Sequence, residues 1–323
     1  MDAEKKIKTF PFYRLSGTHR QIGQQHGEYC KELIHKHLNS VYHHLNVHYH
    51  ITPDVAMQKA LEYRPYVLKY APFLDEEIQG IADGANISIG EAYVLQVRAE
   101  LNKEFQRHNE CTSFVLTSEA TEDGVPIIGE NIDLPAFYTE VGVMIEVVPD
   151  EGLASLMFTP AGQVSYIGIN ELGLGVFGNY LNCEGWRLGL PRYMYTRVAL
   201  NYDTVEKATK ALQTLHRSAP QNLIMLDKFG DAVDLEITAT QVASIEPKDG
   251  MIAHTNHFIA EALLHEERST GYKLENSQTR LKTMKALSEA AHGQLTVEKL
   301  TDILYDRSHY PHCIYRKPGD QDE

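Results

Sequence analysis

One cysteine stands where the sequence changes character. Cys111 lies in the stretch RHNECTSFVLTS, where a charged run of helical character ends and a segment of β character begins. A cysteine thiolate can attack an acyl carbon, and this chemistry needs a base for the thiol proton and donors that stabilise the developing oxyanion. Lone cysteines are more often small buried hydrophobic residues. The pattern therefore leaves two interpretations of Cys111 open, a catalytic nucleophile and a core thiol.

Three segments downstream of this cysteine place polar residues among apolar or turn residues. The segments are GENID, AHTNHF and NSQTR, and they contain Asp133, Asn256 and Arg280. Polar groups in such surroundings are candidates for holding and activating a nucleophile. The sequence contains neither the GxSxG elbow of serine hydrolases nor a GxxxxGKS phosphate loop. The cysteine is therefore the strongest candidate for a catalytic group.

Two other patterns could bind a ligand but have ordinary explanations. GLGVFG matches GxGxxG, yet a dinucleotide site needs a helix after the third glycine, and the following NYLNCEGW is poor helix sequence. We therefore expect a glycine-rich strand or turn. SVYHHLNVHYH carries four histidines, of which His44 and His48 share one side of a helix and could bind a metal. Because no third ligand is evident, we expect a solvated helix face and predict no metal site.

The composition argues against several classes of protein. The chain has 323 residues, a formal net charge of −14 and a pI of about 5.6, without a basic stripe, so nucleic-acid binding is not expected. Four cysteines without a CxxC pair argue against a disulfide framework or a zinc ribbon. The N-terminus lacks the apolar core of a signal peptide, and no apolar run has the length of a membrane span. We therefore expect a cytoplasmic protein without membrane attachment.

The first 110 residues are predicted to be mostly helical. Thr18 and Gln21 form the pattern of a capping box at a helix start, and apolar residues follow at helical spacing. Further helices are expected over residues 53–70, 72–84 and 90–105.

From residue 112 onward the pattern changes to short β-like runs separated by Gly, Asp and Asn turns. Helical patterns return at 191–200, 204–215 and 276–290, and further strands are expected in NLIMLDKFG, AVDLEIT and MIAHTNHF. This order of elements indicates an α+β fold in which antiparallel sheet lies between helices.

A series of segments, spread over nearly the whole chain, resembles one known family. The segments are LSGTHRQIGQQHG, EEIQGIADGANIS, CTSFVL, GENID, IGINELGLGVFGNYLN, AHTNHF, NSQTRL and DRSHYPHCIYRKP. Their order and spacing resemble the acyl-coenzyme A:isopenicillin-N acyltransferase-like group and, more distantly, the bile-salt hydrolases and acid ceramidase, all of them N-terminal-nucleophile hydrolases. The resemblance implies an αββα sandwich, with two antiparallel β-sheets packed between helical layers.

The resemblance also implies self-cleavage immediately before the nucleophile, between Glu110 and Cys111. The cut would give a helical chain, 1–110, and a β-rich chain, 111–323, which remain one integrated domain as an α/β heterodimer. This division coincides with the change in sequence pattern, and the order of any further homo-oligomer is left open. Two positions depart from the relatives: Glu110 stands where many have glycine, and Glu130 stands where bile-salt hydrolases have arginine. The second departure favours the acyltransferase-like branch.

Once cut, Cys111 would supply both nucleophile and base. A free α-amine has a pKa of about 7.7–8.0 and a thiol a pKa of about 8.5, so the amine can accept the thiol proton near neutral pH.

The other roles follow from the resemblance. Asp133 would orient the new amine, Asn256 would donate its side-chain amide to the oxyanion, and Arg280 would balance charge beside the thiol. Ser277, one helical turn before the arginine, would support it. Asn179 is a second candidate for the oxyanion, although turn capping would also explain an asparagine there.

These observations predict an autoprocessed cysteine amidohydrolase or acyltransferase that acts on a small N-acyl compound through a thioester. Acyl-CoA is one candidate donor, and no cofactor is expected. The aromatic residues Phe137, Tyr138, Tyr180 and Trp186 are candidates for lining the substrate pocket, although such residues are more often part of a core. The alternative is a homologue that stays uncut, has no catalytic activity and binds a small molecule or a partner.

Overall fold

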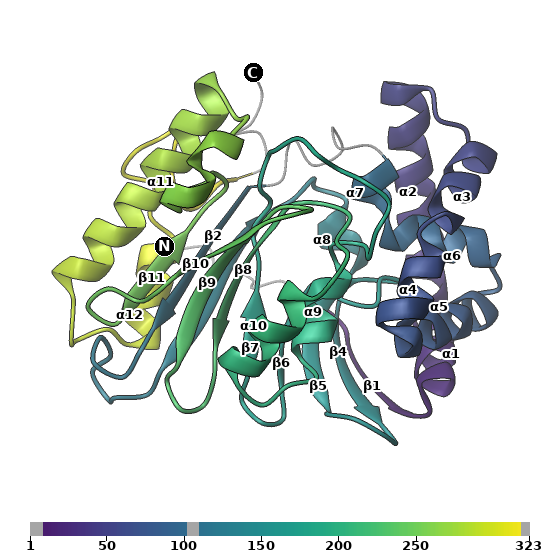
Figure 1. The fold of residues 1–323 in the computed structure, drawn as a ribbon, viewed down its shortest axis with the longest axis horizontal. Helices are drawn as coiled ribbons and strands as arrows, with labels where there is room; N and C mark the ends of the chain where they lie inside the picture. The colour runs from purple at the N-terminus through teal and green to yellow at the C-terminus, as the bar shows by residue number, and fades with distance from the viewer. Residues whose placement is uncertain (1–8, 102–109, 318–323) are drawn as a thin grey trace, which may run out of the picture.

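The computed structural model describes residues 9–101 and 110–317, and its N-terminal third is a layer of helices (Figure 1). These helices are α1 (His19–Tyr29), α2 (Lys31–Tyr49), α3 (Pro53–Leu61), α4 (Arg64–Tyr70), α5 (Pro72–Ala85), α6 (Ile89–Gln96) and α7 (Arg98–Leu101). The capping box expected at the start of α1 is present, because the Thr18 hydroxyl accepts from the N–H of Gln21 and the Gln21 side chain accepts from the N–H of Thr18.

Two of the predicted helices are divided. The helix expected over 53–70 ends at Leu61 and resumes at Arg64. Pro65 explains the break, because a proline inside a helix has no N–H to donate and clashes with the carbonyl four residues earlier. The helix expected over 90–105 divides at Val97, and its last four residues lie outside the described part.

Helices α1 and α5 pack backbone to backbone through glycines. A Cβ atom on Gly23 would lie 2.0 Å from the carbonyl oxygen of Glu77, and one on Gly80 would lie 2.2 Å from that of Arg20. One turn further along, a Cβ atom on Gly27 would lie 2.6 Å from the carbonyl oxygen of Ile81, and one on Gly84 would lie 2.2 Å from that of Gln24. The helix pair therefore depends on these residues having no side chain.

The larger sheet contains eight strands in the order β1-β4-β5-β6-β7-β8-β9-β10. They are β1 (Phe12–Gly17), β4 (Gly142–Pro149), β5 (Ser155–Pro160), β6 (Ile167–Asn170), β7 (Gly175–Phe177), β8 (Gln221–Leu226), β9 (Ala232–Ile237) and β10 (Val242–Ile245). Neighbouring strands are antiparallel except β1 and β4, which are parallel. The sheet is antiparallel, as expected, except at this edge, where the N-terminal segment contributes a strand as well as helices and that strand pairs in parallel.

The smaller sheet has the order β11-β2-β3, with β2 (Glu110–Leu116) in the centre, β3 (Ile127–Asp133) on one side and β11 (Met251–His254) on the other. On its outer face lie α11 (Gly271–Ala290) and α12 (Val297–Leu304) (Figure 1). Short helices α8 (Tyr138–Val141), α9 (Met194–Ala199), α10 (Val205–Gln213) and the 3-10 helix η2 (Glu261–Glu266) complete the elements.

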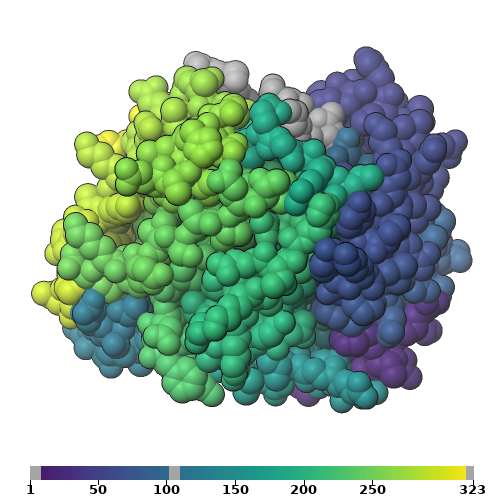
Figure 2. All heavy atoms as spheres, in the orientation of Figure 1, coloured from purple at the N-terminus to yellow at the C-terminus, as the bar shows by residue number. Residues whose placement is uncertain are grey.

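Apolar clusters join these parts into four layers. The largest cluster lies between the N-terminal helices and the eight-stranded sheet, a second lies between the two sheets, and a third lies between the small sheet and helices α11 and α12. Figure 2 shows the N-terminal helices and the C-terminal third on opposite sides of one face, with the middle of the chain between them. The predicted αββα layering is therefore confirmed. No described helix combines the length and apolar character needed to cross a lipid bilayer.

Candidate active site

Cys111 is the second residue of β2 and is buried between the two sheets. Its backbone N–H donates to Oδ1 of Asn256 at 2.7 Å, and its carbonyl accepts from Nη1 of Arg280 at 2.5 Å. Both polar groups of its backbone are thus fixed by side chains that are distant in sequence. The site brings together three residues that the sequence selected.

Arg280 connects the parts of this site. It lies on α11, is fully buried, and its Nη1 also donates to Oγ1 of Thr112 at 2.9 Å. Nη2 donates to Oδ1 of Asn256 at 2.9 Å, and Nε donates to Oδ1 of Asn276 at 2.7 Å. A planar guanidinium can meet several acceptors at fixed angles, which a lysine ammonium cannot reproduce.

Glu110, on the other side of the candidate cleavage bond, is held by a second arginine. Its carboxylate pairs with Arg316, and Nη2 of Arg280 lies 3.7 Å from the same oxygen. Asp133 is the partner of Glu110 in the β2–β3 register and is in electrostatic contact with both Arg316 and the thiol of Cys111. Sequence reasoning missed Arg316, although it lies in the C-terminal segment that carried part of the resemblance.

Ser277 supports Asn256, whereas the sequence had assigned it to Arg280. The hydroxyl of Ser277 accepts from the backbone N–H of Asn256 at 2.8 Å and lies 2.7 Å from Nδ1 of His257. The side-chain amide of Asn256 donates to the carbonyl of Tyr180 at 3.0 Å. The loop after β11 is therefore positioned by α11 and by the chain after β7.

Asn179 is fully buried and contacts residues of both β2 and the loop after β11. Its amide donates to Oγ of Ser113 at 3.0 Å and to the carbonyl of Thr255 at 2.9 Å. These bonds tie β2, β11 and the chain after β7 together. They give Asn179 a structural position, with its donors directed at neighbours of Cys111 and not at the thiol.

Glu130 is a group that sequence reasoning named only as a departure from relatives. Burial raises the pKa of its carboxyl to about 8, although the Cys111 thiol and the N–H of Gly178 beside it favour the ionised form. Burial, followed by the nearby carboxylates of Glu130 and Asp133, raises the pKa of the Cys111 thiol well above its ordinary value, and Arg280 opposes this shift. The uncut thiol is therefore protonated at neutral pH and needs a base.

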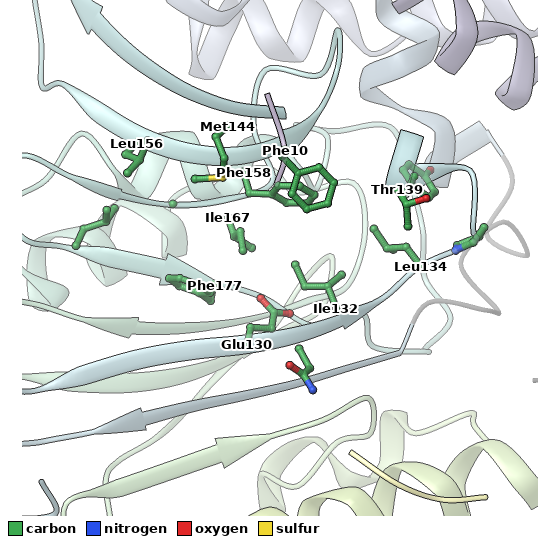
Figure 3. A pocket seen from close by; sticks show the side chains of 15 residues that line it. Phe10, Glu130, Ile132, Leu134, Thr139, Met144, Leu156, Phe158, Ile167 and Phe177 are labelled. Atoms are coloured by element: carbon green, nitrogen blue, oxygen red, sulfur yellow. The ribbon is translucent and has the colours of Figure 1, made fainter. Parts of the chain in front are cut away.

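A cavity of about 550 Å³ opens beside Glu130, between β3 and the large sheet (Figure 3). Its lining includes Ile132, which is opposite Cys111 in the β2–β3 register, but not Cys111 itself. Its lining is mostly apolar and includes Phe10, Ile132, Leu134, Met144, Phe158 and Ile167, with Glu130 directed into it. Among the aromatic residues selected from the sequence, Tyr138 lines this cavity.

The other three aromatic candidates do not line this cavity. Phe137 lines a separate groove with the histidines of α2, and Trp186 donates to the carbonyl of Cys183 at 3.0 Å while packing against a tyrosine cluster. Tyr180 contacts the site through its backbone carbonyl. None of these three residues lines the apolar cavity.

The GLGVFG pattern forms a glycine-containing strand, as expected, and the histidines of the second pattern lie on α2. The second glycine of GLGVFG begins β7, and no helix starts at its last glycine. The rings of His44 and His48 lie 4.6 Å apart on α2. Among residues 9–101 and 110–317, no group of three or more His, Cys, Asp or Glu side chains is arranged to hold a metal ion.

Sequence comparison identifies the family to which this chain belongs. Residues 120–323 match the family described as acyl-coenzyme A:6-aminopenicillanic acid acyl-transferase, and the chain belongs to that family. It is 27% identical to the acyl-coenzyme A:6-aminopenicillanic-acid-acyltransferase 40 kDa form of Emericella nidulans. The alignment extends over 305 residues and covers 93% of this chain and 83% of that protein.

Two solved structures are similar at a lower level. A mutant conjugated bile acid hydrolase from Clostridium perfringens matches with a TM-score of 0.41 and 15% identity, over 60% of this chain and 78% of that chain. Penicillin V acylase from Agrobacterium tumefaciens matches with a TM-score of 0.35 and 12% identity, over 64% of this chain and 68% of that chain. The family membership rests on the sequence matches.

Proposed function

We propose that this protein is a self-cleaving cysteine enzyme that hydrolyses or transfers the acyl group of a small N-acyl compound. The observation that carries the proposal is the fixation of Cys111, whose N–H is held by Asn256 and whose carbonyl is held by Arg280. A core thiol would not require two buried polar side chains on its own backbone groups. Membership of an acyltransferase family supports the same chemistry.

Self-cleavage converts the chain into its active form. The Sγ atom of Cys111 attacks the carbonyl carbon of Glu110, the peptide C–N bond breaks, and the thiol proton ends on the released nitrogen. Water then hydrolyses the thioester, which gives a carboxylate on Glu110 and restores the thiol. The products are residues 1–110 and 111–323, held together by the shared sheet and core.

The new α-amine then serves as the base of the mature enzyme. Its ordinary pKa of about 7.7–8.0 suits proton transfer near neutral pH. Asp133, in electrostatic contact with the thiol, orients the amine, and the side-chain amide of Asn256 donates to the oxyanion. The apolar cavity holds the acyl group, and the thioester on Cys111 is resolved by water or by an amine acceptor.

Acyl-CoA is the proposed donor if the enzyme is a transferase. A hydrolase would release a free carboxylic acid from an N-acyl compound in water, whereas a transferase would form a new amide from acyl-CoA and an added amine. Incubation with an acyl-CoA and 6-aminopenicillanic acid, and separately with an N-acyl compound in water, followed by mass spectrometry, separates these outcomes. A new amide in the first mixture identifies the transferase. Release of acid from the N-acyl compound, with no amide formed in the first mixture, identifies the hydrolase.

The autoprocessing proposal is tested by electrophoresis of the purified full-length chain. We expect two bands whose masses add up to 36.5 kDa, and mass spectrometry should find a fragment that begins Cys-Thr-Ser. Cys111→Ala should give a single band, whereas Cys30→Ala, at a buried thiol in the helical layer, should be cut like the parent. A parent chain that stays whole after long incubation would favour the uncut, non-catalytic alternative.

A further inference from the structure

The base of the mature enzyme does not exist before the cut. In the uncut chain the nitrogen of Cys111 is a peptide nitrogen, whose N–H donates to Asn256. A peptide nitrogen is not basic, so it cannot take the thiol proton. Burial and neighbouring carboxylates keep that thiol protonated. Self-cleavage therefore needs a second base that is present in the folded precursor.

Glu130 is placed to be this base. In the β2–β3 register Glu130 is opposite Ser113, and Ile132 is opposite Cys111. Side chains alternate between the faces of a strand, so Cys111, Ser113 and Glu130 share the face that looks towards the large sheet. Cys111 and Glu130 are therefore diagonal neighbours on this face. Diagonal neighbours in an antiparallel pair lie about 7–8 Å apart, a distance that a long side chain can span.

The surroundings of the Glu130 carboxyl leave it available to exchange a proton. Both of its oxygens are buried, and neither has a hydrogen-bond partner of good geometry among the described residues. The polar groups beside it are the thiol of Cys111 and the N–H of Gly178. The hydroxyl of Tyr166 is in electrostatic contact with both the thiol and the carboxyl. Burial raises the carboxyl pKa to about 8, so it changes protonation near neutral pH.

Asp133, the other carboxylate near the thiol, is less well placed. It lies opposite Glu110 in the register, on the face of the sheet that looks towards α11, where it meets the charge of Arg316. Arg280 also acts on the thiol, but an arginine stays protonated and cannot accept a proton.

We propose that Glu130 accepts the thiol proton of Cys111 during self-cleavage and passes it to the leaving nitrogen. This role rests on the proposed autoprocessing. In the first step the S–H proton moves to the Glu130 carboxylate as sulfur bonds to the carbonyl carbon of Glu110. In the second, the C–N bond breaks and the protonated carboxyl returns that proton to the Cys111 nitrogen. The carboxylate is regenerated, and the products are a thioester and a free α-amine.

The test follows cutting of freshly made chain. Full-length protein is labelled by cell-free translation, moved into buffers from pH 6.5 to 9.5, and sampled over time on gels. Cutting of the parent should accelerate as the pH rises through about 8 and then level off, because the ionised carboxylate is the active form. Glu130→Gln should be at least about a hundredfold slower at pH 8, with a rate that keeps rising at high pH as the thiol itself ionises.

Matched variants separate a proton-transfer role from a structural one. Glu130→Asp keeps a carboxylate and should cut faster than Glu130→Gln, whereas Glu122→Gln, at an exposed carboxyl, should behave like the parent. Hydroxylamine cleaves thioesters, so it should not rescue Glu130→Gln if the first step is blocked.

Three results would overturn the role of Glu130 while autoprocessing stands. They are a parent-like rate and pH profile for Glu130→Gln, no advantage of Asp over Gln, and full rescue by hydroxylamine. A parent chain that is never cut would instead overturn the proposed function itself.

Discussion

The side-chain oxygen of Asn256 accepts the backbone N–H of Cys111 at 2.7 Å, across 145 residues of sequence. The same oxygen accepts from Arg280 at 2.9 Å, while the Asn256 amide donates to the carbonyl of Tyr180. One side chain therefore holds the atom that becomes the α-amine and also carries the donor proposed for the oxyanion.

Two substitutions at Asn256 separate its acceptor from its donor. Asn256→Asp keeps an oxygen for Cys111 and Arg280 but loses the amide donor, so fragments should still form while kcat on an N-acyl substrate falls about a hundredfold or more. Asn256→Ala removes both functions and should also slow fragment formation. Timed gels and steady-state kinetics check these outcomes. Unchanged kcat in the Asp variant would exclude the donor role.

Arg280 should stabilise the fold as well as the site. Arg280→Met would remove donors from the Cys111 carbonyl, Thr112 and Asn256 in a buried setting. Buried acceptors that lose a charged donor are costly, so we expect a loss of about 3 kcal/mol in the free energy of unfolding. Urea unfolding in the uncut Cys111→Ala background measures it. Lys282→Met, exposed on the same helix, should change it by less than about 0.5 kcal/mol.

The apolar cavity should set the preferred length of the acyl group. Leu156 lies on β5 and lines the cavity while 38% exposed, so the larger side chain of Leu156→Trp would fill part of the cavity volume. We expect kcat/KM for a decanoyl amide to fall at least about tenfold, a loss typical of removing a few methylene contacts, and that for an acetyl amide to stay unchanged. Fragment formation should also be unaffected.

The control for this change is Leu188→Trp, at a leucine with a similar exposure of 39% that does not line the cavity. Equal losses for long and short acyl groups in Leu156→Trp, or a chain-length effect in Leu188→Trp, would contradict the assignment of the cavity to the acyl group.

The layers of the fold could be predicted because local patterns and the family resemblance agreed, but the edge of the large sheet could not. Strand β1 is short, and its residues are mostly partly or fully exposed, so its alternation is weak. It pairs with β4 in parallel, Phe12 with Met144, and nothing local in the sequence encodes so distant a partner. Likewise, the sequence shows the glycines of α1 and α5 but not why glycine is needed there. They are needed because the two helix backbones are in direct contact.

The site could be predicted as a set of residues but not as a set of bonds. Cys111, Asn256 and Arg280 were selected and do converge, whereas Ser277 was assigned to the wrong partner. The raised pKa of Glu130 depends on burial between sheets, which a sequence shows only after the fold is known. The hydrogen-bond partners and pKa shifts of the site residues therefore follow from the folded structure and not from single motifs.

A buried histidine of the helical layer should make stability depend on pH. His26 lies on α1, and its Nε2 accepts the backbone N–H of Gly162 at 3.0 Å, so this nitrogen carries no proton in the folded chain. Burial, together with the nearby charge of Arg197, lowers the pKa of His26 to about 4, against the opposing effect of Glu77. The folded pKa is thus below the ordinary value of 6.5, and protonation favours the unfolded chain.

The contribution of His26 to stability should be complete above pH 6.5 and should fall as the pH drops towards 4, by about 3 kcal/mol over that interval. His26→Gln offers Gly162 an acceptor that does not titrate, so its free energy of unfolding should fall less steeply with decreasing pH. Urea unfolding of both proteins between pH 4 and 7.5, in the Cys111→Ala background, measures the difference in slope. Parallel curves would mean that His26 has the same pKa in the folded and the unfolded chain, and that the bond to Gly162 is not formed as described.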